Sequence, residues 1–237
     1  MNTRRISTGN LAIRPLDANT WPDFAGLVER HSGLFSGCWC TWFHQYPDPP
    51  ERKVLGNREF KKKLVETGLT HASLVFDGDE AVAWAQFGAV TELPNIHHRK
   101  QWEIETEHRP EYRITCVFVD KRYRQAGLAE VAVRGALLLI GQQGGGLVEA
   151  YPHDLSEKKK AGKKVSSSFL YNSTRTMYER LGFTYLRPKG LGNCVMSRQV
   201  VRVSDGGIGE AKSLAQAKRQ RQDTRPLSSG NTKDPGT

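Results

Sequence analysis

Apolar and polar residues alternate along several short stretches of this chain, and each stretch predicts a β-strand. The predicted strands cover residues 11–16, 72–76, 81–90, 113–119, 147–151, 183–186 and 194–201. The second and third of them flank Asp77-Gly78-Asp79, a sequence typical of the turn in a β-hairpin. The chain is therefore expected to form a sheet with at least one antiparallel pair.

Other stretches repeat apolar residues every three or four positions, as amphipathic helices do. They cover residues 19–30, 51–67 and 127–142, and a late helix is expected to begin at Ser173 or Thr174 and to end at Gly182. In the helix 51–67 the predicted inward residues are Val54, Phe60, Leu64 and Val65, and Gly56 weakens it. Strands alternating with helices predict an α/β fold.

The remaining stretches lack a regular pattern. Residues 33–50 and 94–110 are predicted to be loop-rich and aromatic, and residues 156–168 form a Lys- and Ser-rich loop. After residue 203 hydrophobic positions become sparse, so we expect one domain over 1–203 and a disordered tail over 204–237.

Composition narrows the class of protein. The 237 residues are 38% hydrophobic and 25% charged, which suits a globular core. No apolar run approaches the roughly 20 residues that span a bilayer, and no secretory signal follows Arg4 and Arg5. The four cysteines are scattered, so a reducing cytoplasm is the expected location.

The net charge of +10 raises the question of an anionic partner. Basic residues cluster at 52–63, 121–124 and 158–164, and their aromatic residues are Tyr123 and Phe60, of which Phe60 is predicted to face inward and so not to stack on bases. We therefore favour a small anionic ligand over nucleic acid.

The stretch from Val117 to Ala129 is the most informative part of the chain. An apolar strand stops at Asp120, basic residues follow, and a small-residue helix starts after Gly127. The first N–H groups of a helix have no acceptor within the helix, and Gly127 allows a ligand to approach them closely. This arrangement predicts an anion site suited to a diphosphate, with the side chains of Arg122 and Arg124 adding positive charge.

Two motifs in this order resemble those of the GCN5-related N-acetyltransferase (GNAT) superfamily. The first is Arg-x-x-Gly-x-Ala, from Arg124 to Ala129. The second is Tyr-Glu-Arg-Leu-Gly-Phe, from Tyr178 to Phe183, about 50 residues later. The resemblance covers about residues 10–201, and the Cys-Trp-Cys segment from Cys38 to Cys40 is similar to that of a bacterial branch of the superfamily.

The resemblance implies a mixed, mainly antiparallel central sheet flanked by helices, the acyl-CoA N-acyltransferase fold. It also implies acetyl-CoA as co-substrate, although a longer acyl-CoA would fit the same motifs, and it implies no metal. The residues implied to bind the cofactor are Val117, Phe118, Val119, Arg124, Gln125, Ala126, Gly127, Leu128, Ala129 and Asn172. Val117 to Val119 would pair with the pantetheine arm, and the loop after them would bind the diphosphate.

Acetyl transfer needs an acid for the leaving thiolate and a way to remove a proton from the amine. Tyr178 stands where many members of the superfamily carry a tyrosine acid, and its ordinary pKa near 10 keeps it protonated at pH 7. Asn172 lies six residues before Tyr178, whereas seven is commoner in the superfamily. The base stays open among Glu92, His97, His98, His44 and Glu149, of which Glu149 is favoured because its strand lies beside the expected cleft.

Cys38 and Cys40 raise the question of a metal, with His31 or His44 nearby in the sequence. A second pair of ligands with zinc spacing is absent from the sequence, since Cys116 and Cys194 stand alone. We therefore expect these thiols to pack with the neighbouring tryptophans.

The function expected from these observations is transfer of an acetyl group to a primary amine, by direct attack in a ternary complex. A small-molecule acceptor is favoured, because residues 97–110 and the aromatic segment are able to close a pocket. The alternative is a non-catalytic module on the same fold that binds coenzyme A or nucleic acid. A homodimer is compatible with the sequence.

Overall fold

The computed structural model describes residues 11–33, 37–44, 49–156 and 170–203. The chain separates into two units, Met1–Arg202 and Val203–Thr237. The expected tail over 204–237 and nearly all of the expected loop 156–168 lie outside the described residues. Among the described residues no helix combines the length and the apolar character needed to cross a bilayer.

Seven strands form one sheet in the order β1-β2-β3-β4-β5-β7-β6. They are β1 (Leu11–Pro15), β2 (His71–Asp77), β3 (Glu80–Ala89), β4 (Tyr112–Val119), β5 (Gly146–Ala150), β6 (Thr184–Lys189) and β7 (Asn193–Val200). The β4–β5 pair is parallel and the other five pairs are antiparallel. The predicted mixed, mainly antiparallel sheet flanked by helices is confirmed.

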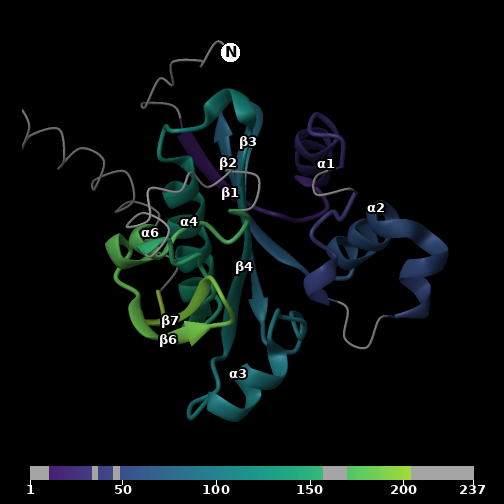
Figure 1. Ribbon diagram of the computed structural model, residues 1–237. Coiled ribbons are helices and arrows are strands. Elements are labelled where there is room, and N and C mark those ends of the chain that lie inside the picture. Colours follow the sequence, from purple (N-terminus) through teal and green to yellow (C-terminus); the bar gives the residue numbers. More distant parts are fainter. Residues whose placement is uncertain (1–10, 34–36, 45–48, 157–169, 204–237) are drawn as a thin grey trace, which may run out of the picture. The chain divides into compact units, whose positions relative to one another are not determined.

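Helices cover both faces of the sheet. They are α1 (Trp21–Glu29), α2 (Pro50–Glu66), α3 (Arg99–Glu105), α4 (Leu128–Gln142) and α6 (Arg175–Arg180), with the short 3₁₀ helices η1 (Trp42–His44) and η2 (Lys121–Tyr123). Figure 1 shows α4 and α6 on one side of the sheet and α1 and α2 on the other. The helix α3 lies inside the segment 94–110, which was predicted to be a loop.

Each face of the sheet has its own apolar core. On one face Ala132, Val133 and Ala136 of α4 pack with strand residues. A Cβ at Gly135 would lie 2.8 Å from the Ile13 side chain, so glycine permits this close packing of α4 on the sheet. On the other face the Trp84 ring lies 4.9 Å from the ring of Phe24 on α1. Residues of β4 contribute to both layers, so the strand lies between them.

The helix α2 departs from its predicted pattern at Gly56. This residue has φ 73° and ψ 167°, which interrupts the helical backbone. The side chain of Val54 was predicted to face inward, but it is 85% exposed. Because the break at Gly56 changes the direction of the chain, the helical repeat that places Phe60 in the core does not extend back to Val54.

The strands β4 and β5 diverge near the middle of β4. Their ladder joins Tyr112–Ile114 to Val148–Ala150. Thr115 is an extra residue opposite β3, because Gln86 pairs with Cys116 and Phe87 pairs with Ile114. Beyond this bulge the N–H of Val117 donates to the carbonyl of Tyr171 at 2.7 Å. Beyond the bulge, the edge of β4 that pairs with β5 at its start therefore forms the wall of a cleft.

Candidate functional site

A cleft of about 650 Å³ opens where β4 leaves β5. The end of β4, the loop after it, the start of α4 and the start of α6 form its walls. The predicted cofactor residues that line it are Val117, Phe118, Val119, Arg124, Gln125, Gly127, Leu128 and Ala129. Ala126 and Asn172, also predicted, are not among its lining residues. The structure thus brings most of the predicted donor residues to one cleft.

Local sequence shapes the loop between β4 and α4. The Asp120 carboxylate accepts from the N–H of Arg122 at 2.9 Å and caps η2. Gly127 has φ 78° and precedes the first residue of α4, where a left-handed backbone favours glycine. The N–H groups of Leu128 and Ala129 in the first turn have no acceptor within the helix. The 15-residue helix α4 therefore directs an anion-binding end into the cleft.

Cationic side chains line the same cleft. Lys121, Arg124 and Arg180 contribute to its walls, together with one carboxylate, that of Glu130. Arg180 donates to Glu130 at 3.2 Å, so part of its charge is already balanced. The cleft is consequently positive near the α4 N-terminus, as a diphosphate site requires.

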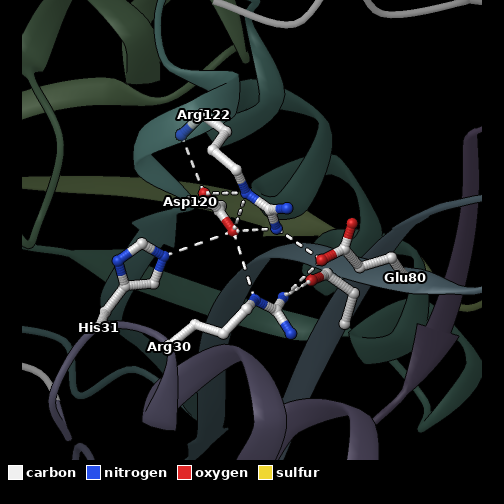
Figure 2. Close-up of polar contacts among 6 residues, drawn as sticks. Arg30, His31, Glu80, Asp120 and Arg122 are labelled. Carbon is white, nitrogen blue, oxygen red and sulfur yellow. Dashed lines mark hydrogen bonds and ion pairs between the residues drawn. The ribbon is translucent and has the colours of Figure 1, made fainter. Parts of the chain in front are cut away.

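Figure 2 shows that Arg122 lies in an ion cluster beneath the loop. Its guanidinium lies 2.7 Å from Asp120 and 2.5 Å from Glu80. Arg30 also approaches Asp120, at 3.6 Å. The prediction that the Arg122 side chain adds charge to the diphosphate site differs from this geometry, because two carboxylates hold its guanidinium and it does not line the cleft.

The ion cluster fixes the charge of Asp120. Burial alone would raise the pKa of this carboxyl, but the hydrogen bonds from the Arg122 side chain and backbone lower it to about 2. The ring of His31 lies 3.4 Å from the same carboxylate and also lines the cleft. Burial lowers the pKa of His31, although Asp120 opposes this shift. Asp120 is therefore ionised at neutral pH, and its ion pairs hold the start of the loop in place.

Tyr178, the predicted acid, is fully buried behind the cleft on α6. Only 1% of the residue is exposed, and its ring meets the Phe183 ring edge-on at 5.0 Å. Burial raises the pKa of its hydroxyl, and the nearby Cys116 on β4 adds to the shift. The hydroxyl is thus protonated at neutral pH and lies within electrostatic reach of β4.

Asn172, the other residue carried over from the late motif, is also buried. Its amide nitrogen donates to the carbonyl of Tyr151 at 3.1 Å. Within the described part of the chain, its amide oxygen accepts no hydrogen bond. A buried acceptor without a donor is uncommon, and ligands often supply the missing partner.

Glu149, the favoured base, belongs to a polar network on the sheet face that α3 covers. It is 1% exposed and accepts from the Trp102 indole at 2.7 Å and from the Tyr151 hydroxyl at 2.8 Å. Arg113 donates to the same Tyr151 hydroxyl at 3.0 Å. Glu149 does not line the donor cleft. It lies beside β4, directly opposite Arg113 in the β4–β5 ladder.

A second buried network, which the sequence pattern did not predict, is centred on Lys61 of α2. The residue Lys61 is 1% exposed, and its ammonium group donates to Thr70 at 2.6 Å and to Gln86 at 2.8 Å. Gln86 in turn donates to Thr115, the bulge residue of β4, at 3.3 Å. Burial lowers the pKa of Lys61 to about 8. The sequence contains one signal for this burial. Lys61 precedes the buried Val65 by one helical turn, so the two side chains lie on the same face of α2.

Among the other base candidates, His44 and Glu92 are half-buried, whereas His97 and His98 are exposed. The Nδ1 atom of His44 lies 2.8 Å from the Glu92 carbonyl, and burial lowers the pKa of His44 well below its usual range. The His97 ring stacks on Trp42 with 4.2 Å between centroids. In the described part of the chain, no three His, Cys, Asp or Glu residues gather as metal ligands.

Comparison with known proteins gives matches to structures only. No family model and no curated protein matches the chain. Among similar solved structures, a GNAT-family acetyltransferase from Listeria monocytogenes is 11% identical, covers 84% of this chain and 99% of its own, and has a TM-score of 0.48. An N-acetyltransferase from Staphylococcus aureus is 10% identical, with coverages of 80% and 97% and a TM-score of 0.45.

A third similar structure is the PaiA N-acetyltransferase from Thermoplasma acidophilum in complex with coenzyme A. It is 10% identical, with coverages of 80% and 98% and a TM-score of 0.43. The three are described as acetyltransferases, the class that the two sequence motifs resemble. At these identities and TM-scores they establish neither an activity nor a substrate for this chain.

Proposed function

We propose that this chain is an N-acetyltransferase that moves an acetyl group from acetyl-CoA to the primary amine of a small molecule. The observation that carries the proposal is the cleft at the diverging end of β4. It combines an anion-binding helix end, cationic side chains and a strand edge in one place. Coenzyme A presents a diphosphate and an extended amide-bearing arm, and so matches these features in order.

The donor is proposed to bind along the cleft from the loop towards the bulge in β4. The α4 N-terminus and Arg124 hold the diphosphate, and the arm runs beside Val117 to Val119. The unpartnered amide oxygen of Asn172 is suited to accept from an N–H of the arm. Asn172 thus keeps its proposed role although it does not line the open cleft.

In the proposed reaction the amine nitrogen attacks the thioester carbonyl carbon. The C–N bond forms, the C–S bond breaks, and the thiolate takes a proton from Tyr178, whose raised pKa keeps the hydroxyl protonated at neutral pH. Glu149 receives the proton of the amine through water, since its carboxylate is buried beneath Trp102. The proposed acid then lies in the core on the α4 side of the sheet, and the proposed base lies against Trp102 of α3.

The acceptor is proposed to bind among aromatic side chains beside β4. The rings of Trp42 and His97 stack, and the Tyr171 ring lies 6.1 Å from the His97 ring. Aromatic faces attract protonated amines and pack against their apolar parts. We place the reaction in a reducing cytoplasm, which suits four cysteines that are all free.

Isothermal titration with acetyl-CoA tests the donor site. The substitution Gly127→Glu puts a carboxylate and a strained backbone at the diphosphate site, and we expect the affinity to fall by about 100-fold or more. Gly68→Glu is the matched control, because Gly68 also has a positive φ, 69°, and open space around it, but does not line the cleft. No binding by the wild type, or equal binding by Gly127→Glu, would contradict the proposal.

A second measurement separates the enzyme from a binding module. Acetyl transfer is followed by mass spectrometry of products over a panel of small amines and basic peptides. Turnover of small amines supports the proposal. Binding of acetyl-CoA without any turnover favours the non-catalytic module, and faster turnover of a longer acyl-CoA would revise the donor.

A further inference from the structure

Two buried thiols lie outside the cleft and take no part in the proposed acetyl transfer. Cys40 precedes η1 and Cys116 lies on β4, and they are 2% and 1% exposed. Their Sγ atoms are 2.8 Å apart. Non-bonded carbon atoms pack at roughly 3.5–4.0 Å, and sulfur is larger, so the two thiols are in unusually close contact.

The backbone around Cys40 is built to hold this contact. Trp39 and Cys40 have φ values of 52° and 53°, a left-handed conformation that is unfavourable for residues other than glycine. Thr41 closes the turn by donating its backbone N–H and its hydroxyl to the Cys38 carbonyl, at 3.0 and 2.9 Å. Strain of this kind persists only where the surroundings determine the conformation.

Two donors face the thiol pair from other elements. The Trp84 indole N–H on β3 makes no hydrogen bond among the described residues, and the Trp84 side chain lowers the pKa of the Cys40 thiol. The Lys61 ammonium on α2 is close enough for Cys40 and Cys116 to act on its charge. Both donors stabilise a thiolate at Cys40, and the thiolate is the form that reacts with oxidants.

We propose that Cys40 and Cys116 form a reversible oxidation site that takes a peroxide as its co-reactant and closes to a disulfide. The Cys40 thiolate attacks one oxygen of hydrogen peroxide, the O–O bond breaks, and a sulfenic acid forms while hydroxide leaves. The Cys116 sulfur then attacks the Cys40 sulfur, the S–S bond forms, the S–O bond breaks, and the oxygen leaves as water. Overall, two thiols and one peroxide give one disulfide and two waters.

The rate of this oxidation depends on how often the Cys40 thiol is deprotonated and how often peroxide reaches it. The hydrogen bond with Cys116 and burial raise the pKa of the Cys40 thiol, against the effect of Lys61 and Trp84. Oxidation is therefore slow at neutral pH, and the peroxide enters when the structure opens locally. The resulting bond joins residues 76 apart in sequence and attaches the segment that includes Cys40 to the strand that lines the cleft.

The proposal is tested by peptide mapping of the full chain. Reduced protein is exposed to hydrogen peroxide, alkylated under denaturing conditions and digested with trypsin. We expect a cross-linked pair of peptides, one holding Cys116 and the other Cys40, that dithiothreitol separates. Because no Lys or Arg stands between Cys38 and Cys40, trypsin leaves both on one peptide, and the Cys38→Ser variant identifies the bonded residue.

Variants of the other cysteines provide the controls. Cys38→Ser and Cys194→Ser should keep the cross-link at the wild-type yield, whereas Cys40→Ser and Cys116→Ser should lose it. If either of the last two does not fold, the map of Cys38→Ser alone still decides. A link through Cys38, a sulfinic acid at Cys40 without a link, or thiols that all survive the peroxide would overturn the proposal. None of these outcomes depends on acetyl transfer.

Discussion

Two of the buried charged groups near β4, Asp120 and Lys61, are held in opposite ways. Asp120, at the end of the strand, is surrounded by the guanidinium groups of Arg122 and Arg30 (Figure 2). Among the described residues, the Lys61 ammonium donates to two neutral oxygens, those of Thr70 and Gln86, and lies 3.4 Å from the His44 ring. The pKa of each is lowered, to about 2 for Asp120 and to about 8 for Lys61.

The same direction of shift has opposite meanings for the two groups. A low pKa favours the charged form of a carboxyl group and the neutral form of an amine. The Asp120 carboxylate is therefore already charged and paired with arginine before any ligand arrives. The Lys61 ammonium, in contrast, loses its proton near neutral pH. Its hydrogen bond to Gln86 connects it to Thr115, the bulge residue of β4.

Among the substitutions that test the contrast between Asp120 and Lys61, replacement of Lys61 by methionine is expected to have the largest effect, which is on the pH dependence of the free energy of unfolding. Below pH 8 the amine is protonated in the folded and unfolded states, and the folded state bears the cost of burying the charge. Between pH 8 and 10.5 only the unfolded state keeps the proton, so the wild-type free energy of unfolding gains up to about 3 kcal/mol from this group. Lys61→Met lacks this gain.

Urea unfolding of the wild type and Lys61→Met at pH 7 and pH 10 measures the difference. Lys62→Met is the matched control, because the Lys62 side chain is 41% exposed and pairs with Glu66 across one helical turn. Its pH profile should follow that of the wild type. A Lys61→Met profile that also follows the wild type would show that Lys61 is charged without cost in the folded protein.

The next largest expected effect belongs to Tyr178, which approaches β4 from the donor side. Tyr178→Phe keeps the ring against Phe183 and removes only the hydroxyl. We expect kcat to fall by about 100-fold, because the leaving thiolate loses its acid, while the Kd for acetyl-CoA is unchanged. Stopped assays with the best amine of the panel measure kcat. An unchanged kcat would remove Tyr178 from the mechanism and leave it as a packing residue.

Asp120→Asn should cost about 2 kcal/mol of unfolding free energy at pH 7, because it leaves Arg122 and Arg30 with one carboxylate fewer. The lowered pKa means that the contribution is complete above about pH 4 and is lost as the pH falls towards 2. Urea unfolding at pH 7 and pH 3 measures the cost, which should be smaller at the lower pH. The exposed Asp79, changed to asparagine, is the control. A cost that is equal at both pH values would argue against a charged Asp120.

The smallest expected effect is that of Glu149→Gln. The amide oxygen of glutamine can still accept from Trp102 and Tyr151, so the fold should be preserved. As a base acting through water, Glu149 should contribute about 10-fold to kcat at pH 7. The loss should shrink as rising pH deprotonates the amine without help. A loss that is constant with pH points to positioning by Glu149.

The parts of the molecule that follow from contiguous sequence were predicted well. The strand, loop and helix from Val117 to Ala129 form one continuous wall, because the turn residues and the helix start are encoded locally. The hairpin at Gly78 is confirmed for the same reason. Local conformational preferences therefore predicted the strand, loop and helix start that line this cleft.

The parts that depend on distant side chains were not predicted. Arg122 lies two residues before Arg124, but Asp120 and Glu80 hold its guanidinium, and Glu80 is 42 residues away in sequence. Lys61 belongs to a highly charged helix, and its burial depends on acceptors from three other segments. A one-dimensional pattern gives the face of a helix, and it does not show which polar group finds partners inside the fold.

The hydrogen bond from Val117 to the Tyr171 carbonyl has a consequence for ligand exchange. An arm that pairs with β4 at this position must displace the carbonyl, so its association is a replacement of one acceptor by another. The net gain from that contact is then close to zero, and we expect the affinity for the donor to arise mainly from the charged end of the cleft. Salt should consequently weaken the donor complex more than truncation of its arm does.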